Sequence, residues 1–217
     1  VVFMVNRSPI CSLTEPMPMP RFARPLPALC SLALLLAPHA SSAQISTALD
    51  PMRLTQLRDF EAFRSSSNNA DLNSNDDSKR PLPGETAVLA DLTGPGVITH
   101  MWITVAASEY AWPRLLRLRI YFDGSTVPSV DAPLGDFFGV GHGMERPLTS
   151  AMVRNASAGR SRNEYWPMPF HKAAKVTITN EGRRRVTNLY YQVDWSKYKS
   201  LPANTPYFHA RYRQALP

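Results

Sequence analysis

The sequence contains little cysteine and no long apolar segment. Only two of its 217 residues are cysteines, Cys11 and Cys30, and both lie near the N-terminus. The rest of the chain therefore has no disulfide to stabilise it and must depend on a hydrophobic core. The longest apolar run, residues 28–37, is too short for the roughly 20 residues that a membrane-spanning helix needs. These absences exclude a disulfide scaffold and predict no membrane insertion after the leader is removed.

Glycine is also scarce, whereas proline is abundant. The chain has 10 glycines and 20 prolines, with 44% hydrophobic and 19% charged residues. This composition is typical of a packed chain and not of a disordered one. Because proline neither continues a helix nor donates a hydrogen bond to a central strand, a helical bundle is disfavoured.

The common motifs for cofactors and nucleophiles are missing as well. The sequence contains no P-loop, no GxGxxG fingerprint and no GxSxG elbow. Its histidines are scattered, without an i, i+4 pair or a cysteine partner for zinc. We therefore predict no metal and no cofactor.

The N-terminal 43 residues have the pattern of an export signal. Two arginines, Arg21 and Arg24, precede the apolar run, and the small residues of Ser41–Ala43 follow it. We expect cleavage near Ala43 and export to the periplasm or the extracellular space, with residues 1–18 lying upstream of the true start. A buried amphipathic helix is the alternative for the apolar run, although that run lacks the polar positions such a helix would need.

Basic residues are in excess, but they do not by themselves indicate a partner. The formal net charge is +7, and the densest cluster is Arg183–Arg185, directly after the turn-like sequence Asn-Glu-Gly. A solvated hairpin tip is the simplest interpretation of this cluster. A nucleic-acid-binding sandwich is a weak alternative, because an exported protein rarely meets that partner.

Downstream of the leader, short alternating segments predict an all-β sandwich. In residues 116–122, for example, Leu116, Leu118 and Ile120 alternate with two arginines, so that one face is buried and the other is wet. We predict a short N-terminal helix and a polar loop in 44–84 and one jelly-roll-like β-sandwich in 85–217. The helix lies within 44–63, and the composition of the polar segment 65–80 favours a linker over a binding loop. The other segments predicted as strands are 86–92, 97–107, 129–134, 175–180 and 186–195.

The segment PLGDFFGVGHG, residues 133–143, is the strongest candidate for a site. Its glycines permit sharp turns, and Phe137 and Phe138 would place one ring on each face of a strand. Together with Asp136 and His142, these rings suit a sugar, since aromatic faces cover C–H patches while polar groups bind hydroxyls. The alternative places both rings in the core.

Several stretches taken in order resemble the N-terminal half of glycoside hydrolase family 172, formerly domain of unknown function 2961. These stretches are GETAVLADLTGPGVITHMWIT, LRLRIYFDGSTVPSVDAPLGDFFGVGHG, YWPMPFHKAAKVTITNEG and LPANTPYFHARYRQALP. The resemblance implies two jelly-roll sandwiches per chain, homo-oligomers (trimers or hexamers), and retaining α-D-fructofuranosidase or α-D-arabinofuranosidase activity without an organic cofactor. It also implies that Asn69 and Asp71, in a loop resembling the family's early loop, contact a furanose-containing glycan.

The resemblance also implies where the chemistry lies. The family's catalytic glutamates lie in the second sandwich, in motifs similar to WWGEGD and GTGTEDYF, and this sequence stops before either motif. We therefore expect an N-terminal part of an exported furanosidase, with the catalytic pair beyond Pro217 and no catalytic residue in this chain. The alternative is a non-catalytic carbohydrate-binding sandwich.

Overall fold

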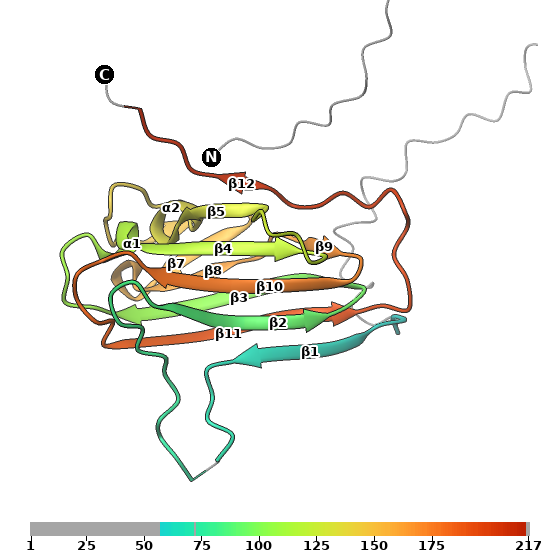
Figure 1. Cartoon of the computed structure of the whole chain (residues 1–217), viewed down its shortest axis with the longest axis horizontal. Coiled ribbons are helices and arrows are strands. Elements are labelled where there is room, and N and C mark those ends of the chain that lie inside the picture. Colours follow the sequence, from blue (N-terminus) through green and yellow to red (C-terminus); the bar gives the residue numbers. More distant parts are fainter. Residues whose placement is uncertain (1–56, 72, 216–217) are drawn as a thin grey trace, which may run out of the picture. The chain divides into compact units, whose positions relative to one another are not determined.

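The computed structural model describes residues 57–71 and 73–215, which form two facing β-sheets (Figure 1). The larger sheet has the order β1-β11-β3-β8-β7-β6, with β9 also paired to β3. Its strands are β1 (Glu61–Ser66), β3 (Gly96–Ala106), β6 (Leu148–Thr149), β7 (Val153–Ala156), β8 (Ser161–Glu164), β9 (Met168–Phe170) and β11 (Asn188–Lys197).

The smaller sheet has the order β12-β5-β4-β10-β2. Its strands are β2 (Thr86–Thr93), β4 (Leu116–Phe122), β5 (Val130–Pro133), β10 (Ala173–Asn180) and β12 (Ala210–Arg211). The described helices are one-turn elements: α1 (Trp112–Leu115), α2 (Leu134–Phe137) and the 3₁₀ turn Ser157–Gly159. None of the described helices is long and apolar enough to cross a membrane.

The predicted all-β sandwich is confirmed, and its core follows from the alternation in the strands. Ile98 and Ile103 of β3 are fully buried, as are Leu118 of β4 and Val176 of β10 on the facing sheet. Burial of each such side chain contributes roughly 1.5–3 kcal/mol. The six segments predicted as strands, including 116–122, all coincide with observed strands.

The predicted N-terminal helix does not extend over the part of its range that the structure describes. Residues 61–66 form β1, which pairs antiparallel with β11 from Glu61 opposite Lys197 to Ser66 opposite Gln192. The Phe63 ring stacks on Trp195 with 5.0 Å between centroids. The hydrogen bonds between β1 and β11 and the stacking of Phe63 on Trp195 therefore stabilise a strand here, although the spacing of apolar residues predicts a helix. Residues 44–56 and the leader lie outside the described residues.

Polar side chains on one face of the larger sheet link β1 to the neighbouring strands. Asp194 of β11 lies 2.5 Å from Nε of Arg64 and 2.8 Å from Nδ1 of His100. Partial burial alone would raise the pKa of Asp194, but the hydrogen bonds from Arg64 and His100 lower it below its usual value. His100 also stacks on Tyr165 at 4.8 Å. These contacts link strands β1, β11 and β3 across the sheet.

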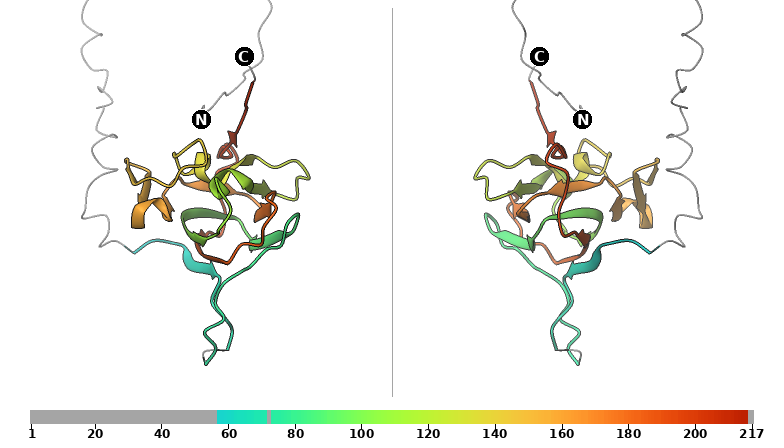
Figure 2. Two further views of the ribbon diagram at one scale, coloured as in Figure 1. Left: turned by 90° about the vertical axis from the view of Figure 1, so that its left-hand side faces the viewer. Right: turned by 90° about the vertical axis from the view of Figure 1, so that its right-hand side faces the viewer.

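The polar segment after β1 is not a linker. Its two ends bind the same strand: the amide of Ser67 donates to the carbonyl of Tyr191, and Lys79 and Leu189 exchange two backbone hydrogen bonds of 2.9 Å. The chain between them projects from the sandwich as a loop (Figures 1 and 2). Composition alone could not reveal that both ends of this segment pair with β11.

Candidate functional site

Two of the predicted site residues, Asp136 and Phe137, line the same pocket of about 240 Å³. It lies between α2 and the C-terminal segment that follows β11. Its lining residues come from β5, the α2 turn, the β8–β9 connection and that C-terminal segment: Ala132, Asp136, Phe137, Gly139, Gly141, Trp166, Phe208 and Ala210–Arg213. We call it the α2 pocket. It is smaller than the roughly 300–1,000 Å³ of pockets for drug-sized ligands, so its size suits a single sugar ring.

The turn that forms one wall depends on two glycines. Gly139 has φ +78°, a conformation that other residues rarely adopt. At Gly135, a Cβ atom would lie 2.8 Å from the carbonyl oxygen of Val140 and 2.9 Å from Pro113. The glycines therefore let the α2 turn fold tightly against its neighbours and hold Asp136 at the pocket.

Aromatic rings form a second wall. Phe208 lies edge-on to Phe137 with 6.4 Å between centroids and is tilted against Trp166 at 6.1 Å. The fourth ring, Tyr212, is covered by the Arg114 guanidinium at 4.6 Å, and Arg114 also donates a hydrogen bond to the Tyr212 hydroxyl. Such rings can cover the apolar C–H face of a sugar.

Asp136 supplies the acceptor of the α2 pocket. Its Oδ2 lies 3.5 Å from Nε of Arg114, too far for a hydrogen bond, and is buried without a hydrogen-bond partner among the described residues. The side chain as a whole is 15% exposed and lines the pocket, so the part of the carboxylate that remains accessible can accept a hydrogen bond from a ligand hydroxyl. The pocket thus combines one carboxylate with a wall of rings.

The α2 segment differs in one respect from the sequence prediction. It forms a helical turn instead of a strand, and its two rings are perpendicular, at 80°. Phe138 is completely buried in the core, whereas Phe137 retains an edge on the pocket. Placing Phe138 at a site is therefore wrong: a fully buried ring has no surface for a ligand, and the alternative that put the rings in the core describes it.

The other predicted residues lie elsewhere. His142 is exposed, with φ +59°, and lines a wider groove on the other side of the same turn. Asn69 and Asp71 lie in the projecting loop beside β1. There the side-chain amide of Asn69 donates a hydrogen bond to the Ser74 hydroxyl, and the backbone amide of Asp71 donates one to the side-chain oxygen of Asn69. That loop and α2, whose residues line the pocket, lie at opposite sides of the sandwich (Figure 1). One copy of the domain does not bring these two groups together.

The family model for the first β-sandwich domain of glycoside hydrolase family 172 matches residues 55–214. The chain belongs to glycoside hydrolase family 172. A search of curated proteins found no match. The domain is thus a β-sandwich module of a glycoside hydrolase family, and the α2 pocket is its best-formed candidate sugar site.

Sequence reasoning missed the wall of the α2 pocket that the C-terminal segment provides. Phe208 and Tyr212 lie far from α2 in the chain, and only the fold brings them there. Their one signal was the last of the stretches that resemble the family. Among residues 57–71 and 73–215, no group of three or more histidine, cysteine or acidic side chains is placed to hold a metal ion.

Proposed function

We propose that this domain is the first sandwich of an exported furanosidase and that its α2 pocket holds one furanose ring of the substrate. The observation that carries the proposal is the pairing of the family 172 match with a ring-lined pocket containing Asp136. Glycoside cleavage needs two carboxyl groups, about 5 Å apart for retention. Asp136 is the only carboxylate among the residues that line the pocket. The catalytic pair then comes from the family's second sandwich.

The first test compares hydrolysis with binding. The full chain is incubated with p-nitrophenyl α-D-arabinofuranoside and with α-D-fructofuranosides, alone and joined to a second sandwich of the family. We expect the chain alone to bind these sugars without cleaving them and the joined protein to hydrolyse them. Hydrolysis by the chain alone that is lost in Asp136→Asn would contradict the assignment and make Asp136 a catalytic residue.

Asp136→Asn is expected to weaken furanoside binding about tenfold. The substitution removes the charge from an acceptor, and a hydrogen bond to a charged group contributes roughly 1.5–3 kcal/mol. Titration calorimetry of the wild-type chain and the variant with arabinofuranose oligomers measures the change. Asp91→Asn, at an exposed carboxylate on β2, is the matched control and should leave affinity unchanged. Equal affinities of wild type and Asp136→Asn would remove Asp136 from the site.

The alternative, a non-catalytic carbohydrate-binding module, rests on the same single carboxylate. It shares the binding result but predicts no hydrolysis even when a second sandwich is supplied.

Export and self-association into trimers or hexamers are further parts of the proposal. Fusion of residues 1–43 to a reporter active only outside the cytoplasm tests export, and sedimentation of the purified chain tests assembly.

A further inference from the structure

The end of the sandwich where β3 finishes carries five arginines that form no ion pair with the described residues. The turn between β10 and β11 contains Arg183, Arg184 and Arg185, all exposed. Arg146 and Arg160 line a groove of about 960 Å³ at this end. None of these five side chains forms an ion pair within the part of the chain that the structure describes. We call this surface the arginine groove.

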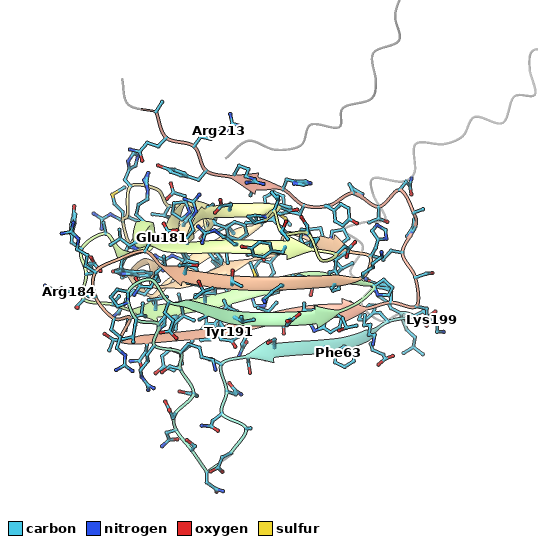
Figure 3. All side chains as sticks on the ribbon, in the orientation of Figure 1. Phe63, Glu181, Arg184, Tyr191, Lys199 and Arg213 are labelled. Carbon is cyan, nitrogen blue, oxygen red and sulfur yellow. The ribbon has the colours of Figure 1, made fainter. Side chains whose placement is uncertain are left out.

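Backbone hydrogen bonds hold the turn that contains Arg183–Arg185 against the groove. Glu109, which lines the groove, accepts hydrogen bonds from the amide of Arg183 at 2.9 and 3.1 Å and from that of Arg184 at 3.0 Å. The carboxylate thus binds backbone and leaves the guanidinium groups to solvent. Arg184 lies at one end of the molecule, and Lys199 lies at the other (Figure 3).

Five other arginines of the domain are paired with acidic side chains. Arg64, Arg80 and Arg114 each face an aspartate, and Arg117 lies 2.6 Å from Asp131. The groove also contains two carboxylates, which offset part of its positive charge: Glu109, and Glu145, which accepts a hydrogen bond of 2.6 Å from the indole N–H of Trp112. Arg58, Arg154, Arg211 and Arg213 also lack an ion pair among the described residues, and two of them line the α2 pocket. The groove and its adjoining turn differ in carrying five such arginines at one end of the sandwich.

The groove also offers an aromatic surface. Tyr110 lines it and has 94% of its surface exposed. An exposed ring beside several guanidinium groups matches a polymer with sugar faces and carboxylate or phosphate groups. We propose that the arginine groove binds an anionic polysaccharide, at a site separate from the α2 pocket.

The test measures binding of the full chain to polygalacturonate, which carries carboxylates, and to a phosphate-bearing mannan. Uncharged dextran and duplex DNA serve as comparison polymers. We expect binding to at least one anionic polysaccharide, none to dextran, and a several-fold loss of affinity between 50 and 200 mM salt because the contacts are exposed. Binding to neither anionic polysaccharide, or equal binding to dextran, would overturn the proposal.

The variants locate the site. Arg183→Gln/Arg184→Gln/Arg185→Gln should lower the affinity about tenfold, and Tyr110→Ala several-fold. Lys172→Gln/Lys197→Gln/Lys199→Gln, which removes the same charge near the Gly96 end of β3, is the matched control. An equal loss of affinity in this control would mean that binding depends only on net charge, and would overturn the proposed site. DNA binding that is tighter than polysaccharide binding and unaffected by Tyr110→Ala would overturn it in favour of a nucleic-acid partner. Asp136→Asn should not change this binding, so the two proposals fail independently.

Discussion

Glu164→Gln is expected to make the domain markedly more stable at alkaline pH and to remove most of the dependence of its stability on pH between 5 and 8. Glu164 lies on the inner face of β8 and is fully buried. Burial raises the pKa of its carboxyl to about 8, only partly opposed by the hydrogen bond from the Trp166 amide. Its Oε1 has no hydrogen-bond partner among the described residues. The carboxyl is therefore protonated at neutral pH.

The direction of the pH effect follows from the two states. In the unfolded chain the carboxyl has its ordinary pKa of 4.5, whereas in the folded chain its pKa is about 8. Between these values the folded state holds a proton that the unfolded state has released. The free energy of unfolding therefore falls by roughly 2–4 kcal/mol as pH rises through this window.

Glutamine has nearly the shape of a protonated glutamate and does not titrate. Urea unfolding of wild type and Glu164→Gln at pH 5, 7 and 9 should give similar stabilities at pH 5 and a variant that is more stable by a few kcal/mol at pH 9. Glu61→Gln, at an exposed position on β1, is the matched control and should follow the wild-type profile. Parallel profiles for wild type and Glu164→Gln would show that the Glu164 carboxyl titrates normally.

The buried cation next to Glu164 does not remove this effect. Arg162 lies on the same inner face of β8 and is also fully buried. Its guanidinium lies 4.6 Å from the Trp112 ring, and Nη1 donates to the carbonyl of Arg160. Burial lowers the pKa of Arg162 to about 10, so it remains charged at pH 7. No ion pair joins the two side chains in the described structure.

The β8 strand also illustrates where sequence reasoning failed. In SRNE both faces of the strand are polar, so alternation gives no sign that Arg162 and Glu164 point inward. By contrast, LRLRIYF has one apolar face, and the burial of Leu116, Leu118 and Ile120 could be predicted. Where the two faces of a strand differ in polarity, the alternation of residues specifies which face is buried. Where both faces are polar, packing against the neighbouring strands determines which side chains point inward.

The candidate site was predictable only in part, for a similar reason. The glycines of the α2 segment marked a tight turn, and Asp136 and Phe137 do line a pocket. A two-residue period could not tell a strand from one helical turn, so the prediction placed Phe138 on a surface. The wall made by Phe208 and Tyr212 depends on β12 pairing in parallel with β5, a contact between distant segments that local pattern does not contain.

Asp123 is the residue whose loss should most disturb that wall. It has φ +54° at the end of β4, and its carboxylate accepts three backbone hydrogen bonds at the turn between β9 and β10. It also accepts a hydrogen bond of 2.6 Å from the Tyr207 hydroxyl, next to Phe208. Partial burial by itself would raise the pKa of Asp123, but the bonds from Tyr207 and the three amides lower it below its usual value.

Asp123→Ala is expected to cost about 2–4 kcal/mol, because the three amides lose an ionised acceptor and alanine tolerates a positive φ poorly. Tyr207→Phe removes one of the four bonds and should cost about 1 kcal/mol. Because the folded pKa of Asp123 is depressed, the stabilisation is present above the unfolded pKa and is lost as pH falls. Urea unfolding at pH 3 and pH 7 should therefore show a smaller difference between wild type and Asp123→Ala at pH 3.

Limited proteolysis measures how far each substitution loosens the wall. The segment from Tyr207 to Arg213 contains two arginines, and trypsin should cut it faster in both variants, in the same order as their losses of stability. Asp91→Asn, on the same sheet but away from this segment, should match wild type. A cleavage rate that is unchanged in Asp123→Ala would mean that pairing of β12 with β5 and the packing of Tyr212 under Arg114 hold the wall without the Asp123 clamp.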